Sequence, residues 1–373
     1  MKRLKALIKV EIKPVLLIGL LFLIANIIGF MGIQSQLSSN WREYLIGGLA
    51  GHFNWYWLVD IIGRGFFSTI GIVSSIYMGL IIILVFASFR YEKSVEVSRF
   101  LKSLPYTQRE RCLVKIGVGS GAITIGMLVF LAGLIYFRYY SMNLFAEVME
   151  ITALGNVAAE IFSLEKILGA VVLAYVVLMA AYLFMVMVQY MISHRMAAII
   201  IGILSALAPV FIIEVSMALF DVPWDSGIGQ AARSITYVMT SFVNWVPIYG
   251  NGDEYRYYHH ISYLTGFIYH LAFYVSVMIA SLLGTLYFAK VNRLENSDLL
   301  MPHSAVRGIF MVGVSVCGGL SIGGLLSIFF GDVLLMPSPL PTVILFVIGV
   351  IISFFIAKKI AFIGIKKRKG VNI

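Results

Sequence analysis

Long apolar runs without a charged residue recur along this 373-residue chain. Each run holds about 18 or more residues, enough for a helix to cross roughly 30 Å of hydrocarbon. Charged residues make up only 12% of the sequence, about half the fraction that is usual in soluble domains. The sequence therefore predicts a polytopic membrane protein and excludes an ordinary soluble globular domain.

The apolar runs predict an all-α fold with eight membrane-spanning helices. The fourth and fifth runs are separated only by Ser193–Arg195, which predicts a tight hairpin. No composition shift divides the chain, so we expect one membrane domain over 1–373. The expected spans are 14–33, 66–88, 113–137, 167–193, 196–220, 266–289, 309–330 and 340–364.

Lys and Arg are unevenly distributed between alternate polar segments. With the N-terminus in the cytoplasm, the inner segments hold 22 of the 28 basic residues but only 6 of the 18 acidic ones. Basic residues concentrate on the cytoplasmic side of membrane proteins, so both termini are predicted to be cytoplasmic. The net charge of +10 is then typical of this bias rather than of nucleic-acid binding. The terminal stretch "KKIAFIGIKKRKG" also suits anionic lipid headgroups.

The same orientation assigns each polar segment to one side of the bilayer. The cytoplasmic loops are 89–112 and 290–308. The outer segments 34–65, 138–166 and 221–265 are long and aromatic. Because Trp and Tyr favour the membrane–water boundary, we expect interfacial helices in these outer segments.

Motifs for chemistry are missing from the sequence. It contains no G-x-x-x-x-G-K-[ST], so ATP hydrolysis by a P-loop is excluded, and H-E-x-x-H does not occur. Cys112 and Cys317 form no C-x-x-C pair, and a disulfide framework is not expected. We interpret His259–His260 as solvated loop residues rather than metal ligands. The sequence thus predicts no catalytic residue, metal or cofactor in this chain, which is not expected to be an enzyme.

Ionisable side chains inside a membrane are costly and usually functional. The expected spans contain Glu214 and His270, both near outer ends. Glu214 either extends to the interface or bonds a neighbouring helix, or it lines a substrate cavity. With Trp224 of the third outer segment, these residues are candidates for a substrate path.

Within the expected spans, two Gly-x-x-x-Gly motifs allow close helix contact. One is formed by Gly117 and Gly121, the other by Gly319 and Gly323. In a chain with this many spans we expect internal packing, with dimerisation as the alternative.

The first cytoplasmic loop predicts a short amphipathic helix that ends at a proline. An apolar stripe recurs at helical spacing, and the opposite face is polar and charged. Pro105 removes a backbone donor and disfavours helix at the preceding residue, so the helix ends there. The stripe is formed by Val97, Phe100, Leu101 and Leu104, and the polar face by Glu96, Ser98, Arg99, Lys102 and Ser103.

A new helix is predicted to start directly after this corner. Thr107 to Glu110 fits the S/T-x-x-E capping box, in which the two residues bond each other's backbone amides. The short helix could lie in the headgroup layer. Its mixed charge, with Glu92, Glu96 and Glu110 among the bases, favours docking into a groove of a protein partner.

"FRYEKSVEVSRFLKSLPYTQRERCLVKI" resembles the cytoplasmic loop of type-2 ABC transporter permeases, the ABC-2 family. Those loops show a Glu, a polar stretch, "SLP", a Thr or Ser with Arg, and a Lys at the next span. In that family the loop is a coupling helix that fits a cleft on the ATPase subunit. The matching positions here are Glu92, Ser103, Leu104, Pro105, Thr107, Arg109 or Arg111, and Lys115.

A second stretch, "YFAKVNRLENSDLLMPHSAVRGIFMVGVSVCGGL", is similar to a later loop in a bacterial subgroup of these permeases. An aromatic-basic-acidic run follows the sixth span there, and Tyr287, Arg293 and Glu295 match it here. Many members of the family have fewer spans than the eight predicted here.

The resemblance implies the membrane subunit of an ATP-driven exporter in a bacterial cytoplasmic membrane. Its partners would be a separate ATP-binding cassette ATPase, which carries the ATP and Mg²⁺, a second permease subunit, identical or related, and the lipid bilayer. An ATP-independent sensor or scaffold, and a secondary transporter that uses Glu214, are the alternatives. The residues expected at the ATPase contact are Glu92, Arg99, Phe100, Leu101, Lys102, Ser103, Leu104, Pro105, Thr107 and Arg109.

Overall fold

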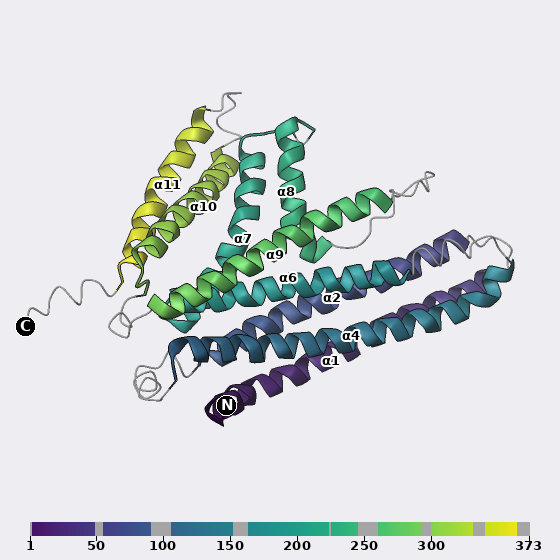
Figure 1. Ribbon diagram of the computed structural model, residues 1–373. Helices are drawn as coiled ribbons and strands as arrows, with labels where there is room; N and C mark the ends of the chain where they lie inside the picture. Colours follow the sequence, from purple (N-terminus) through teal and green to yellow (C-terminus); the bar gives the residue numbers. More distant parts are fainter. Residues whose placement is uncertain are drawn as a thin grey trace, which may run out of the picture. The chain divides into compact units, whose positions relative to one another are not determined.

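The computed structural model describes residues 2–48, 55–90, 106–151, 163–223, 225–244, 260–291, 300–330 and 340–363. The regular structure of these residues is entirely helical, as Figure 1 shows. Eight of the described helices are long and apolar enough to cross a membrane. The prediction of an all-α, multi-pass membrane protein is therefore confirmed. The helices are α1 (Lys2–Gly48), α2 (Trp55–Ser88), α4 (Gln108–Ile151), α6 (Leu164–Met191), α7 (Arg195–Leu219), α8 (Gly227–Asn244), α9 (His260–Val291), α10 (Ser304–Phe330) and α11 (Leu340–Ala361).

Three helices are longer than their expected spans. α1 continues to Gly48, α2 already begins at Trp55, and α4 continues to Ile151. Hydropathy detects only the part of a helix that crosses lipid. The helical hydrogen bonds of the backbone continue beyond it until residues that disfavour helix are reached. The Gly47–Gly48 pair at the end of α1 is such a place. Much of the expected outer segments 34–65 and 138–166 is therefore a continuation of the flanking helices.

α1 also begins at Lys2, well before the expected start at residue 14, and the other bounds lie within about six residues of those expected. α6 ends at Met191 and α7 begins at Arg195, so the tight hairpin is confirmed. His194 caps α7, because its side chain accepts a hydrogen bond from the Ala197 amide. In the third outer segment, α8 is a separate helix of 18 residues, which is not among the candidate spans.

The chain divides into two compact units, each assembled from separate stretches of sequence. The first unit contains 1–88, 113–183 and 241–280, and the second contains 89–112, 184–240 and 281–373. α4, α6 and α9 each contribute residues to both units. The prediction of a single membrane domain stays a prediction.

Polar side chains are paired inside the first unit. The Asn26 side-chain amide on α1 donates a hydrogen bond to the Gly126 backbone carbonyl of α4 at 2.9 Å, and the Tyr77 hydroxyl of α2 donates to Asn26 Oδ1 at 3.0 Å. Because lipid offers no hydrogen bonds, polar groups at this depth need protein partners. The Phe22 ring packs on Tyr77, with their centroids 4.4 Å apart. This cluster links α1, α2 and α4.

In the second unit, α10 and α11 pack as a close pair, visible side by side in Figure 1. A Cβ added to Gly319 would lie 3.0 Å from the Val350 backbone nitrogen, and one added to Gly323 would lie 3.3 Å from Phe346 Cα. This motif therefore serves internal packing, as expected. A Cβ on Gly117 or Gly121 would meet no atom of another described element within 4 Å, so the role of that motif stays a prediction.

Candidate functional site

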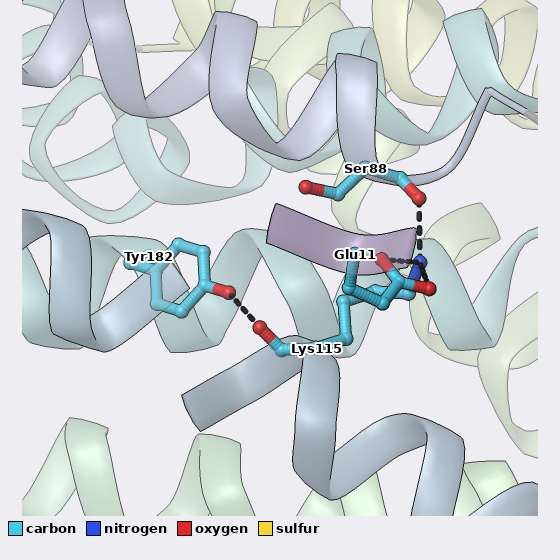
Figure 2. A network of polar contacts seen from close by, with 4 residues as sticks. All are labelled: Glu11, Ser88, Lys115 and Tyr182. Atoms are coloured by element: carbon cyan, nitrogen blue, oxygen red, sulfur yellow. Dashed lines mark hydrogen bonds and ion pairs between the residues drawn. The ribbon is translucent and has the colours of Figure 1, made fainter. Parts of the chain in front are cut away.

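The end of α2, the start of α4 and the start of α1 meet at one lysine in the first unit. The Lys115 ammonium on α4 donates to the Ser88 carbonyl at 2.5 Å and to both Glu11 carboxylate oxygens, at 3.2 and 3.3 Å (Figure 2). The last carbonyls of any helix lack partners within that helix. Lys115 therefore supplies a missing donor at the end of α2 while it binds α1.

The Lys115 ammonium is fully used in this geometry. An ammonium has three N–H donors, and the two Glu11 oxygens with the Ser88 carbonyl offer three acceptors. The Lys115 side chain is only 2% exposed and that of Glu11 14%. Burying two charges is costly, and such a pair persists only when its remaining hydrogen bonds are satisfied. The contact is thus a specific tie between helices, not an exposed ion pair.

A fourth helix joins through the backbone of the same lysine. The Tyr182 hydroxyl on α6 donates to the Lys115 carbonyl at 3.0 Å (Figure 2). Gly119, one turn further along α4, faces the Tyr182 ring so closely that an added Cβ would collide with the ring. Glycine at this position lets the tyrosine reach the backbone. We name Glu11, Ser88, Lys115 and Tyr182 the Lys115 junction.

The start of α4 is closed by the predicted capping box. The Glu110 amide donates to Thr107 Oγ1 at 3.2 Å, and the Thr107 amide donates to Glu110 Oε2 at 2.8 Å. The Thr107 hydroxyl also donates to Glu110 Oε2, at 2.9 Å. This reciprocal pairing confirms the prediction. Lys115 follows Thr107 by eight residues on one helix, a rise of about 12 Å.

The residues on both sides of the loop between α2 and α4 are therefore held by specific contacts. At its start, the junction binds Ser88, and the Phe89 ring lies edge-on to Tyr190, with centroids 5.2 Å apart. At its end, the capping box holds Thr107.

A second junction lies in the second unit, at the residues that precede α10. The Ser193 amide donates to the Leu300 carbonyl at 3.0 Å, and the Leu300 amide donates to the Ile363 carbonyl at 3.5 Å. These bonds connect the α6–α7 turn, the residues before α10 and the end of α11. Met301 packs there in an apolar cluster with Val306 and Ala361. We name Ser193, Leu300 and Ile363 the Leu300 junction.

No family model matches the chain, and neither curated proteins nor solved structures give a match.

The structure describes only part of the predicted site. Thr107 caps α4, and Arg109 is exposed on the first turn of that helix. Glu214 is half-buried on α7, and His270 is buried on α9; they belong to different units. The predicted site residues outside the described part of the chain are Glu92, Arg99, Phe100, Leu101, Lys102, Ser103, Leu104, Pro105, Trp224, Arg293 and Glu295.

The partners in the Lys115 junction were not predicted from the sequence. Lys115 lies in the expected span 113–137 and was singled out only through the loop resemblance, whereas Glu214 and His270 were named as the ionisable residues within spans. Glu11 and Lys115 both lie within candidate spans. A signal was present, because a lysine two turns inside an apolar helix needs a partner of opposite charge. Glu11 is the only acidic residue before residue 43, which makes it the natural candidate.

Proposed function

We propose that this chain is the membrane-spanning subunit of an ATP-driven exporter of the ABC-2 type in a bacterial cytoplasmic membrane. A separate ATP-binding cassette subunit would bind ATP and Mg²⁺, and a second permease subunit would complete the pathway. The observation that carries the proposal is the anchoring of the loop that resembles a coupling helix. Its flanking residues, Ser88 and Thr107, are held by the Lys115 junction and by the capping box.

This anchoring supports a mechanical role for the loop. Closure of the ATPase on ATP would displace the short helix that we expect around Phe100. Because Lys115 links the end of α2 to α1 and α4, the displacement would move these helix ends together. The Tyr182 bond would extend the movement to α6. The substrate would cross between the two permease subunits, and Glu214, Trp224 and His270 remain candidates for its path.

Co-purification tests the partner. The full-length chain, expressed in its own cells and extracted in mild detergent, is expected to retain an ATPase with a P-loop. Phe100→Asp places a charge on the apolar stripe and should release that ATPase. Ser98→Asp adds the same charge on the polar face and should retain it. Retention of the ATPase by Phe100→Asp, with undiminished stimulation of its ATP hydrolysis, would show that the docking assignment is wrong.

Cysteine labelling tests the side of the membrane. In a background without Cys112 and Cys317, a reporter cysteine replaces Arg90, an exposed residue just after α2. A second reporter replaces Ile228, which is exposed on α8. In intact cells an impermeant maleimide should label the Ile228→Cys chain and leave the Arg90→Cys chain unmodified until the membrane is opened. The reverse pattern would contradict the proposed orientation and with it the ATPase contact.

A further inference from the structure

The first turns of α1 carry two stripes of side chains on opposite faces. Lys5, Lys9 and Lys13 are exposed and follow one another at four-residue intervals. This spacing keeps three helical residues within an arc of about 80°. Between them on the other face, Leu7 is buried and Glu11 belongs to the Lys115 junction. One face of this segment thus packs inside the first unit while the other presents only lysines as its charged groups.

The lysine stripe lacks a counter-charge within the described chain. Lysines four residues apart on a helix repel each other unless an opposite charge lies nearby. Among the described residues, no carboxylate pairs with Lys5, Lys9 or Lys13. Glu11 cannot serve, because it lies on the opposite face and is bound by Lys115. An external anion would therefore neutralise this face.

The position of the stripe along α1 matches the headgroup layer. The uninterrupted apolar run begins at Pro14. With a rise of 1.5 Å per residue, the Cα atoms of Lys13, Lys9 and Lys5 lie about 1.5, 7.5 and 13.5 Å beyond the hydrocarbon edge in an upright helix. The headgroup region is roughly 5–7 Å thick, and charges act over about 8 Å beyond it at physiological salt.

We propose that Lys5, Lys9 and Lys13 form a binding face for anionic phospholipid headgroups. The face is continuous with a membrane-spanning helix, so insertion of that helix brings the lysines to the lipid phosphates. An acidic protein would have to reach the same face inside the headgroup layer, which makes it the weaker candidate. Bound lipid would hold α1 from one side, while Glu11 holds it to Lys115 from the other. This inference does not depend on the proposed transport function.

Lipid titration in native mass spectrometry tests the proposal. The purified full-length chain in detergent is titrated with phosphatidylglycerol and, separately, with phosphatidylcholine. A basic residue near an anionic surface contributes about fivefold in affinity at low salt. The triple variant K5Q/K9Q/K13Q should therefore bind phosphatidylglycerol about 100-fold more weakly, with unchanged phosphatidylcholine binding. The triple variant K5R/K9R/K13R should bind like the wild type.

A matched control removes the same charge elsewhere. The variant R138Q/K166Q/R233Q alters the expected outer segments and should keep phosphatidylglycerol affinity within about twofold, because these residues lie outside the binding face. Equal losses of phosphatidylglycerol affinity in K5Q/K9Q/K13Q and R138Q/K166Q/R233Q would show that net charge alone causes the effect, and would overturn the proposal. Unchanged phosphatidylglycerol affinity in K5Q/K9Q/K13Q would also overturn the proposal. If that variant lost an acidic protein partner while its lipid affinity stayed the same, the lysines would bind protein and not lipid.

Helix content by circular dichroism and elution volume verify that each variant is folded. Should the triple variant fail to fold, the single variant K9Q still tests the central lysine of the face. K9Q should weaken phosphatidylglycerol binding about fivefold. The variant Lys9→Arg keeps the charge and should bind with wild-type affinity. A K9Q chain with wild-type affinity would count against the proposal.

Discussion

The Lys115 ammonium on α4 lies 3.2 Å from the Glu11 carboxylate on α1, across 104 residues of sequence. The pair lies at the end of α2, where Lys115 also binds the Ser88 carbonyl. A buried pair of this kind contributes less through its own attraction than through the cost of breaking it. It therefore fixes which helix ends stay together when the loop is displaced.

Removal of one charge from this pair should be worse than removal of both. Lys115→Met leaves the Glu11 carboxylate buried without its partner and should cost about 3 kcal/mol in the free energy of unfolding. The double variant E11M/K115M buries no charge and should lose clearly less. Denaturant unfolding in detergent micelles measures both values. A double variant as unstable as Lys115→Met would contradict the view that the unpaired charge is the cost.

The packing of α10 on α11 gives a test with a control on the same helix. Gly319→Ala forces a methyl group against the Val350 backbone and should cost about 1–3 kcal/mol through overpacking. Gly313→Ala points into open space and should be neutral or stabilise the helix by up to about 1 kcal/mol. Thermal unfolding followed by circular dichroism distinguishes the two. Equal effects would mean that the close contact at Gly319 is not the determinant.

The capping box should control how firmly α4 begins. Thr107→Ala removes the oxygen that accepts the Glu110 amide and should cost about 1 kcal/mol. Thr107→Ser keeps that oxygen and should retain most of the stability. Hydrogen exchange at the Glu110 amide gives a local readout, with faster exchange in the alanine variant only. Unchanged exchange in Thr107→Ala would show that the amide is protected by another group.

Acid should weaken the region around the Leu300 junction through His303. Burial lowers the pKa of His303, and its ring packs against Phe288 with centroids 5.1 Å apart. The folded state therefore resists a proton that the unfolded state accepts near pH 6.5. Stability should fall as the pH drops below about 6.5 and level off below the lowered pKa. His303→Phe should flatten this dependence in unfolding curves measured from pH 8 to pH 5; an equally steep curve in that variant would assign the effect elsewhere.

Local features of the chain were predictable because their causes are local. Each charge-free run specifies a span by its length and hydropathy, and the Thr107–Glu110 box specifies the start of α4 within four residues. The turn at Ser193 was equally predictable, because one short polar segment separates two apolar runs. None of these features depends on which helices become neighbours.

Pairing between helices was decided by the tertiary structure. Alternation of spans brings Glu11, Ser88 and Lys115 to the same side of the membrane, but only packing determines that one ammonium binds the other two. From the sequence alone, Gly319 could contact either a second subunit or another helix of the same chain. In the structure α11 packs against it. Lipid solvates every apolar helix surface equally well, so the apolar pattern determines only which segments cross the membrane. Which helices become neighbours is decided by close packing and buried polar bonds, because these join residues far apart in sequence.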